Sequence, residues 1–458
     1  MAFSGDFVWG AATSSYQIEG GWDADDKGEN VWDMQCKWPG KVHGGHTGNV
    51  ACNHYEHYRE DVQLMKQMQL QAYRFSVSWA RVMPEGTGRL SEKGIDFYDR
   101  LIDELLAAEI EPWLTLFHWD YPLALFRRGG WLNRDSVQWF ADYTRVLVDR
   151  FSDRVTHWMT LNEPQCFIGS GHYHGNDAPG IKLPIGEVLL ALHHALMSHG
   201  EAVRVIREHA KIKPTVGWAP VGVVKFPVVE DAAHIDAARH AMFYWYEDDL
   251  PLWTNTWYSD PVVFGRYPAD GLKRFEKHMP WLNEDDMKVM CQPLDFYGAN
   301  IYNGEPIGLD AENKPVSHKR HEGAPVTSFR WAIEPASLYW GAKFLQERYK
   351  LPIVITENGL SNADLVDVDG QVEDPQRIAF LTRYLRELER CLDDDVDVRG
   401  YFQWSLMDNF EWTYGYSQRF GLVHVDFETG ARTPKSSADW YRKVIESNGA
   451  LLSQLTRC

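Results

Sequence analysis

The sequence predicts an α/β protein, a (β/α)8 TIM barrel, from three observations. Eight short apolar runs have the length of strands, longer helical patterns separate most of them, and no Gly-x-Gly-x-x-Gly follows the first run. Alternating strands and helices are typical of parallel βαβ units. A doubly wound open sheet that binds dinucleotides would require the missing glycine motif. The closed barrel is therefore favoured over the open sheet.

The strands are runs of apolar and β-branched residues bounded by turn-forming residues. They are predicted at residues 7–10, 72–76, 112–117, 157–161, 215–218, 296–300, 353–356 and 400–405. The helices are predicted where apolar residues recur with the period of an α-helix. These patterns lie at residues 55–68, 94–108, 134–151, 185–209, 336–349 and 375–392.

The 458 residues contain no Ser/Gly/Pro-rich linker, low-complexity tract or charge block. One domain, residues 1–458, is the simplest organisation. The length in excess of the roughly 250 residues typical of this barrel is expected in βα loops. These loops are predicted at residues 19–53, 169–184, 226–290 and 303–328, where they would wall a pocket.

The composition disfavours several classes of partner. A net charge of −19 opposes binding to nucleic acid or to an anionic membrane surface, so a neutral small molecule is the expected partner. The sequence shows neither a basic start followed by an apolar run nor 18 successive apolar residues, which predicts a cytoplasmic protein. Six scattered cysteines without C-x-x-C spacing predict neither a structural zinc nor a disulfide framework. The 20 tryptophans suit both packing and the two-faced surface of a sugar.

Two glutamates occupy matching positions at the ends of predicted strands. Glu163 follows an apolar run and precedes Pro164, and Glu357 follows another run and precedes Asn358-Gly359. In a parallel α/β barrel, catalytic groups lie where strands end in loops. Hydrolysis of a glycosidic bond requires two carboxyl groups with different tasks. A single glutamate at such a position is more often a loop residue in a salt bridge than a catalytic residue.

The two carboxyl groups are expected in opposite electrostatic settings. A dry, Trp-lined pocket would disfavour the charged form of Glu163 and keep its proton available, with Asn162 beside it for a substrate hydroxyl. Glu357 would have to stay ionised, and Arg74 near the end of another strand is a cation that could hold it so.

The chain resembles glycoside hydrolase family 1, the retaining β-glucosidase family, over nearly its whole length. The resemblance is carried by several motifs in order. They are residues 7–13 (FVWGAAT), 16–20 (YQIEG), 73–79 (YRFSVSW), 118–120 (HWD), 160–164 (TLNEP), 298–302 (GANIY), 355–359 (ITENG) and 404–412 (WSLMDNFEW). The TIM barrel is also the fold that this resemblance implies.

The resemblance implies roles for the matching positions. Glu163 would be the general acid/base and Glu357 the nucleophile, with Arg74, Asn300 and Tyr302 supporting them. The subsite for the glycone, the sugar that is released, would be formed by Gln17, His118, Trp119, Asn162, Trp404, Glu411, Trp412 and Phe420. A charged Glu411 is expected to accept hydrogen bonds from two sugar hydroxyls.

A retaining mechanism requires the two carboxyl groups to lie about 5 to 5.5 Å apart, whereas about 6.5 to 9.5 Å would mean inversion. No metal or organic cofactor is expected. The pair Glu411-Trp412 points to an unphosphorylated sugar, because a carboxylate would repel a phosphate.

The side of the pocket that holds the leaving group, the aglycone side, departs from the pattern of the family. Gln165 stands where Trp is frequent, and Asp177 where His is frequent. Trp331 matches the usual aglycone tryptophan, and Cys166 is expected to border the same side. These changes leave the choice of leaving group open.

Three functions are compatible with the sequence. The leading one is a retaining β-glucosidase acting on aryl β-glucosides, cellobiose or short cello-oligosaccharides in carbohydrate metabolism such as cellulose degradation, with side activity on β-fucosides and β-galactosides. A second is transglycosylation by the same site. A third is a catalytically silent carbohydrate-binding barrel. The sequence leaves the preferred sugar, the natural aglycone and the oligomeric state open.

Overall fold

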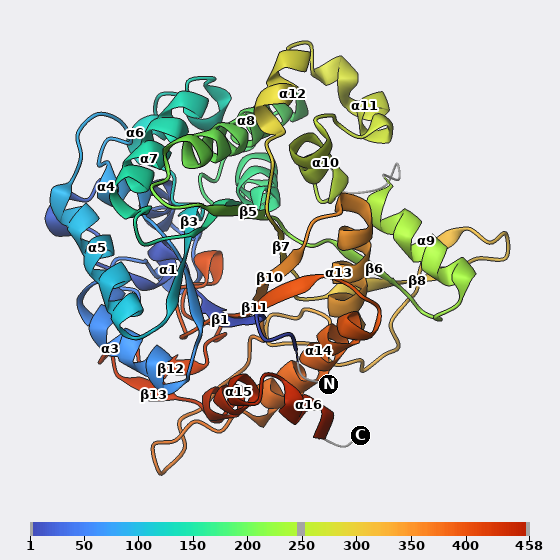
Figure 1. Ribbon diagram of the computed structural model, residues 1–458. Coiled ribbons are helices and arrows are strands. Elements are labelled where there is room, and N and C mark those ends of the chain that lie inside the picture. Colours follow the sequence, from blue (N-terminus) through green and yellow to red (C-terminus); the bar gives the residue numbers. More distant parts are fainter. Residues whose placement is uncertain (1–2, 245–251, 455–458) are drawn as a thin grey trace.

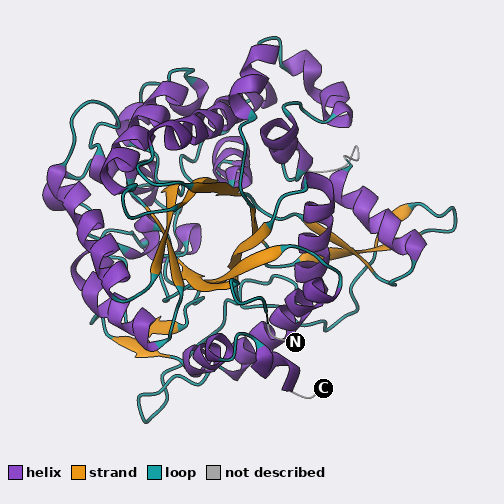
Figure 2. Ribbon diagram, in the orientation of Figure 1, coloured by secondary structure: helices purple, strands orange, loops and turns teal. Residues whose placement is uncertain are grey.

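The structure, a computed structural model, describes residues 3–244 and 252–454 and contains a barrel of eight parallel strands ringed by helices (Figures 1 and 2). The barrel strands are β1 (Val8–Ala12), β2 (Ala72–Ser76), β3 (Glu111–Phe117), β4 (His157–Asn162), β5 (Thr215–Ala219), β7 (Tyr297–Asn300), β10 (Ile353–Asn358) and β11 (Val398–Trp404). The predicted (β/α)8 barrel is confirmed, and each predicted strand overlaps one of these.

The strands are hydrogen-bonded in the order β5-β4-β3-β2-β1-β11-β10-β7. The barrel closes between β5 and β7, where the amide of Asp295 donates to the carbonyl of Val216 and the amide of Asn300 donates to that of Pro220. An isolated parallel bridge between Val221 and Asn300 continues this closure. All eight carboxyl ends therefore lie at one rim, which is the catalytic end of such barrels.

The larger helices of the outer ring match the predicted ones within two residues at each end. They are α3 (His54–Gln67), α5 (Glu92–Ala107), α7 (Ser136–Phe151), α8 (Ile185–His209), α13 (Ala336–Tyr349) and α14 (Pro375–Asp393). In α5 the side chain of Ser91 accepts a hydrogen bond from the amide of Gly94, which caps the first turn. Apolar residues of α5 at helical spacing, such as Ile95, Leu101 and Leu105, are buried against the barrel.

The segments predicted as long βα loops contain short elements. The segment after β5 holds β6 (Val224–Pro227), α9 (Ala232–Phe243), α10 (Thr256–Phe264), α11 (Ala269–Phe275), η5 (Glu276–His278) and α12 (Glu284–Met290). Strand β6 pairs with the hairpin β8 (Gly304–Leu309) and β9 (Pro315–Ser317), which projects from one side in Figure 2. Part of this segment, residues 245–251, lies outside the described residues.

Other short elements complete the chain. They are α1 (Ser15–Ile18), η1 (Ala24–Asp26), α2 (Val31–Cys36), η2 (His43–Gly45), α4 (Trp79–Val82), α6 (Leu123–Phe126), η3 (Gly130–Leu132), η4 (Gln165–His174), η6 (Trp412–Tyr414), β12 (Val423–Val425), β13 (Arg432–Pro434), α15 (Ser436–Glu446) and α16 (Ala450–Gln454). Strands β12 and β13 form an antiparallel pair. No helix among residues 3–244 and 252–454 combines the length and the apolar character needed to cross a membrane.

A compact cluster of side chains fills the inside of the barrel. Its members come from nearly every strand: Ala12, Ala72, Trp113, Met159, Ala219, Phe296, Val354, Phe402, Trp404 and Phe420. The ring of Trp113 lies 4.9 Å from that of Phe402, centre to centre. Gly10 and Gly217 make room for this packing, because a β-carbon at either position would come within 2.5 Å of Phe402 or Phe296. The interior is therefore a packed core that supports the rim above it.

Candidate active site

A cavity of about 620 Å³ opens at the rim formed by the carboxyl ends of the barrel strands. Most of the predicted site residues line it: His118, Trp119, Glu163, Cys166, Asn300, Tyr302, Trp331, Glu357, Trp404, Glu411 and Trp412. The other four lie directly behind these: Gln17, Arg74, Asn162 and Phe420. The structure thus brings together all of the predicted positions, although they come from seven strands or the loops that follow them.

A larger hollow of about 1180 Å³ lies outside the barrel, between α9, α10 and α13. Two of its arginines are already engaged: Arg239 pairs with Asp236 and Glu347, and Arg348 pairs with Asp260. The rim cavity is the better candidate for an active site, because it combines carboxyl groups whose pKa values are raised with walls of aromatic side chains.

Glu357 is a buried carboxyl group held by two donors. Arg74 Nη1 lies 2.6 Å from its Oε1, and the hydroxyl of Tyr302 donates to its Oε2 at 2.8 Å. Burial raises the pKa of Glu357, while the charge of Arg74 and the bond from Tyr302 oppose that rise. Arg74 is itself fully buried and also donates to the carbonyl of Thr356. The guanidinium therefore favours the ionised form of Glu357 over that of any neighbouring carboxyl group.

Glu163 is also buried, but its charge is less compensated than that of Glu357. Its backbone adopts a left-handed conformation with φ of 44°, which is uncommon for a residue with a side chain and is concentrated at functional sites. Its amide donates to the carbonyl of Ala219 at 2.8 Å, and Cys166 Sγ lies 3.5 Å from its Oε2. Burial and then the charge of Glu357 raise the pKa of Glu163 to about 8. At neutral pH this carboxyl group therefore holds a proton.

Asn162 links the surroundings of the two glutamates. Its Oδ1 accepts hydrogen bonds from Arg74 at 2.5 Å and from Asn300 at 3.0 Å, and its Nδ2 lies 3.0 Å from His118 Nε2. Asn300 in turn accepts a bond from Thr356 at 2.7 Å. These bonds fix the orientation of the Asn162 amide, so its polar atoms are pre-arranged before any ligand enters.

Glu411 is a third carboxyl group facing the cavity. Its Oε2 lies 3.3 Å from Gln17 Nε2, which also donates to Asn409 at 3.0 Å. Burial, followed by the charges of Glu357 and Glu163, raises the pKa of Glu411 to about 8. Burial, helped by the nearby carboxylates, therefore disfavours the charged form of Glu411 that the sequence led us to expect.

Aromatic rings form the base and one side of the cavity. Trp404 lies 5.6 Å from the ring of His118, centre to centre and nearly parallel to it, and Trp119 lies 4.6 Å from Trp412. Trp119 and Trp412 both have left-handed backbones, with φ of 77° and 48°. Phe420 packs behind Tyr302 at 6.2 Å. Broad apolar faces next to polar groups suit a ligand that is itself two-faced.

Both residues expected on the aglycone side, Trp331 and Cys166, line the cavity. Trp331 lies 5.0 Å from Tyr302, and Cys166 borders the cavity as expected. Gln165 does not face the cavity: it is buried and bonds through its side chain to the backbone of Val221. The helix that follows Glu163, η4, is π-helical, a form that is frequent at functional sites.

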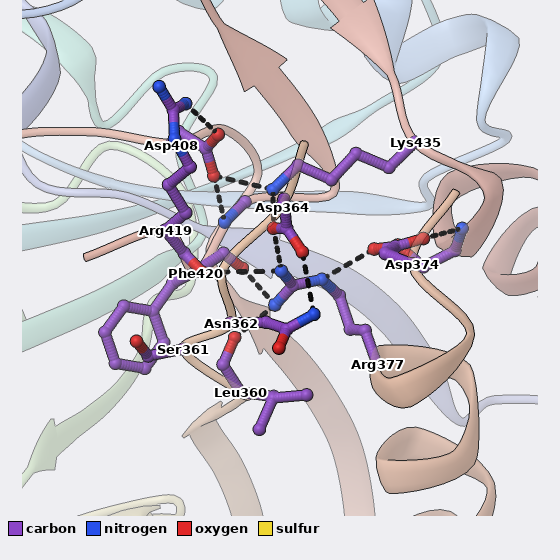
Figure 3. Close-up of polar contacts among 12 residues, drawn as sticks. Leu360, Ser361, Asn362, Asp364, Asp374, Arg377, Asp408, Arg419, Phe420 and Lys435 are labelled. Carbon is purple, nitrogen blue, oxygen red and sulfur yellow. Dashed lines mark hydrogen bonds and ion pairs between the residues drawn. The ribbon is translucent and has the colours of Figure 1, made fainter. Parts of the chain in front are cut away.

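A buried ion network holds the loops that follow β10 and β11 (Figure 3). At its centre the guanidinium of Arg377 contacts Asp364 and Asp374, the latter at 2.8 Å. Arg377 also donates to the carbonyls of Leu360 and Phe420. One side chain thus ties the loop that follows Glu357 to the segment that carries Phe420.

Lys435 extends this network to the loop that carries Glu411. Its Nζ lies 2.5 Å from Asp364 and 2.7 Å from Asp408. Asp408 also accepts from Arg419 at 2.6 Å and from the amide of Gly421 at 3.0 Å. No motif in the sequence pointed to Arg377 or Lys435. Only the position of Asp408 between Trp404 and Glu411 pointed to this region.

Comparisons with known proteins agree with this geometry. The Glycosyl hydrolase family 1 model matches residues 1–450. The chain is 42% identical to "Beta-glucosidase A" of Acetivibrio thermocellus over 455 residues, 98% of this chain and 99% of that protein. It is 41% identical to "Beta-glucosidase A" of Thermotoga maritima over 449 residues, 97% of each. A solved structure of a Thermotoga maritima β-glucosidase in complex with glucoimidazole superposes with a TM-score of 0.89 at 40% identity, covering 98% of this chain and 99% of that one.

Proposed function

The chain belongs to glycosyl hydrolase family 1 and is an O-glycosyl hydrolase, and we propose that it is a retaining β-glucosidase that uses Glu163 and Glu357. The proposal rests on one observation above all: the two carboxyl groups share a cavity, but among the described residues a cation contacts Glu357 and none contacts Glu163. Of the two glutamates, Glu357 therefore ionises first, and Glu163 keeps its proton.

In the first step the ionised Glu357 attacks the anomeric carbon of the sugar. The bond from that carbon to the leaving oxygen breaks, and Glu163 transfers its proton to this oxygen. The products of the step are a glycosyl ester on Glu357 and a neutral leaving group. Tyr302 and Arg74 hold the attacking carboxylate in place through its two oxygens.

In the second step Glu163 acts as a base. Formation of the ester removes the negative charge of Glu357, and this charge is one of the causes that raise the pKa of Glu163. The ionised Glu163 then takes a proton from water, whose oxygen attacks the anomeric carbon and releases Glu357. Two displacements restore the original anomeric configuration. An acceptor alcohol in place of water would give transglycosylation at the same site.

The glycone subsite is assigned to the polar and aromatic groups around Glu357. Trp404 supplies the stacking face, and the residues that bond hydroxyl groups are Gln17, His118, Trp119, Asn162, Glu411 and Trp412, with Phe420 behind. The protonated Glu411 can donate one hydrogen bond and accept others. With a further carboxyl group, Asp177, also on the cavity wall, the site favours an unphosphorylated sugar over a phosphorylated one.

The substrates proposed are β-D-glucosides with aryl or sugar leaving groups, including cellobiose and short cello-oligosaccharides, with weaker turnover of β-fucosides and β-galactosides. Similar relatives are named "Beta-glucosidase A" and "1,4-beta-D-glucan glucohydrolase". A silent sugar-binding barrel is disfavoured because both glutamates and their supporting groups are in place.

Replacement of the nucleophile tests the proposal. Glu357→Ala should lower turnover of an aryl β-glucoside by about 10⁴-fold or more, because no covalent intermediate can form. Azide should restore part of the turnover, with a glucosyl azide of inverted configuration as the product. The wild type should release β-glucose first, as followed by NMR. Undiminished turnover of Glu357→Ala, or release of α-glucose by the wild type, would contradict the assignment.

A further inference from the structure

The charges on the wall of the rim cavity are not balanced. The carboxyl groups that line this cavity belong to Glu163, Asp177, Glu305, Glu357 and Glu411. Arg74 lies 2.6 Å from Glu357 and forms an ion pair with it. Lys225 forms another ion pair with Glu305. The other three carboxyl groups contact no cation in the described part of the chain, so the cavity carries more negative than positive groups.

Asp177 is the first of these three carboxyl groups to ionise. Burial, followed by the charges of nearby carboxyl groups, raises the pKa of Glu163 and of Glu411 to about 8. Burial raises the pKa of Asp177 only to about 6, and the side chains of Thr413 and Ser170 oppose the rise. At neutral pH Asp177 is therefore mostly ionised, whereas the charged forms of the other two are disfavoured. Ionisation of either glutamate would only add to the negative charge.

The charge of Asp177 lies in the part of the cavity that a leaving group enters. Its amide donates to the carbonyl of Ser170 at 3.4 Å, and its carbonyl accepts from the amide of Gly180 at 2.7 Å, which fixes the turn after η4. Burial, and then the charges of Glu163 and Asp177, raise the pKa of Cys166. Cys166 Sγ in turn lies 3.5 Å from Glu163, the group that is proposed to protonate the leaving oxygen. Asp177 therefore acts on the surroundings of that oxygen.

Aromatic rings line the same part of the cavity. Tyr414 directly follows Thr413, a neighbour of Asp177 in space. The ring of Tyr414 lies 4.3 Å from that of Phe329, which lies 4.5 Å from that of Trp331, centre to centre. The face of an aromatic ring attracts a cation, as a carboxylate does. A carboxylate beside aromatic faces is the combination that recognises an ammonium group.

We propose that Asp177 selects β-glucosides whose leaving group carries an ammonium group, which its carboxylate attracts. The substrate class comprises β-glucosides of arylalkylamines and disaccharides in which glucose is β-linked to an amino sugar. A leaving group with a negative charge is disfavoured, because the same carboxylate repels it. This inference rests on the proposed β-glucosidase function and names the leaving group that this site prefers.

Three aryl β-glucosides of similar size test the selection. Their leaving groups are 4-(aminomethyl)phenol, 4-(hydroxymethyl)phenol and 4-(carboxymethyl)phenol. A methylene group separates each substituent from the ring, so the three phenols leave with similar ease. For the wild type at neutral pH and low salt, kcat/KM should fall in the order cationic, neutral, anionic. The ratio of cationic to neutral should be about fivefold.

Replacement of Asp177 should remove this preference. Asp177→Asn keeps the shape of the side chain without its charge and should bring the ratio of cationic to neutral substrate close to one. In the wild type, added salt should lower the ratio, because ions screen the attraction between two charges. Glu187→Gln is the control: it removes one negative charge from the first turn of α8, outside the cavity, and should retain the ratio of the wild type.

A matched pair of disaccharides separates the two sources of the ammonium group. Glucosyl-β-1,4-glucosamine differs from cellobiose by an ammonium group in place of one hydroxyl. A preference for the first that Asp177→Asn abolishes would extend the selection to amino sugars. A preference confined to the aryl glucosides would identify arylalkylamines as the leaving groups that Asp177 selects.

The outcomes distinguish the selection from the proposed function. A wild-type ratio close to one, or a ratio that Asp177→Asn leaves unchanged, would overturn the selection and leave the β-glucosidase function standing. An equal change in Glu187→Gln would also overturn it, because the effect would then come from the net charge of the chain. A wild type that hydrolyses none of these glucosides would overturn the proposed function itself.

Discussion

Two clusters of buried charge lie side by side at the rim of the barrel, and they differ in how their charges are matched. In the network of Figure 3, Asp364, Asp374 and Asp408 are each bonded to a cation. Burial tends to raise the pKa of Asp408, but the charges of Lys435 and Arg419 outweigh it and the pKa is lowered.

In the cavity, the carboxyl groups of Glu163, Glu357 and Glu411 share less positive charge. Glu357 contacts Arg74, whereas no cation contacts Glu163 or Glu411 among the residues that the structure describes. The pKa of each of the latter two rises to about 8, first because of burial. The difference separates buried carboxylates that are paired with cations from carboxyl groups whose raised pKa would suit proton transfer. Carboxylates that are paired with cations stabilise the loops. The pKa values of carboxyl groups without such a partner rise into the range where a proton can be transferred.

Removal of the proposed proton donor, Glu163, should have the largest effect on this comparison. Glu163→Gln should lower kcat/KM for cellobiose by about 10²- to 10⁴-fold, because an amide cannot protonate the sugar leaving group. Activated aryl glucosides, which need little protonation, should lose much less in the step that cleaves them. In the wild type, activity should fall as pH rises through about 8, where Glu163 loses its proton, and the variant should lack this limb.

The pH–rate profiles of both proteins with a dinitrophenyl glucoside and with cellobiose provide the measurement. Glu187→Gln, an exposed glutamate in the first turn of α8, serves as the control and should behave as the wild type. An alkaline limb that persists in Glu163→Gln would assign the proton to another group.

Loss of one cation from the ion network of Figure 3 should lower the stability of the fold. Lys435→Met should lower the free energy of unfolding by about 3 to 5 kcal/mol, because Asp364 and Asp408 would lose a buried partner. Lys443→Met is the matched control: Lys443 is half exposed and pairs with Asp439 on the surface of α15, so its loss should cost about 0.5 kcal/mol. Urea unfolding of the two variants measures the difference. Equal losses would show that the network is no more stabilising than a surface pair.

A smaller effect is expected from Glu411, and its sign depends on pH. The pKa of Glu411 is about 8 in the folded protein and ordinary in the unfolded chain, so the folded state binds the extra proton between these values. Its contribution to stability is present at low pH and is lost as pH rises through about 8.

Glu411→Gln has no proton to lose. Relative to wild type it should therefore gain about 1 to 3 kcal/mol of unfolding free energy between pH 5 and pH 9. Urea titrations at the two pH values test this shift. A difference between variant and wild type that stays constant with pH would mean that Glu411 has an ordinary pKa.

Much of the fold could be read from local sequence. We could predict the strand ends at Glu163 and Glu357 and the helix over Ile185–His209. The spacing of apolar residues and the Pro or Gly residues that end an element depend only on residues close together in the sequence. Most of the other site positions came from the resemblance to the family, through motifs that it shares with this chain. The segment after β5 was predicted only as a long loop, since its short helices give weak periodic signals.

The sequence alone determined which residues meet at the rim. Strands that alternate with helices along the chain run parallel in the barrel, so all of their carboxyl ends lie at one rim. Only the tertiary structure decided what each of them does there. Arg74 favours ionisation of Glu357 because it lies 2.6 Å away, although the two are far apart in the chain. The pKa of Glu411 is raised to about 8 because the fold buries it and then places it near the charges of Glu357 and Glu163, whereas Tyr414, three residues further on, stays exposed. Proton affinity and exposure depend on what surrounds a group in space, and sequence order does not state that.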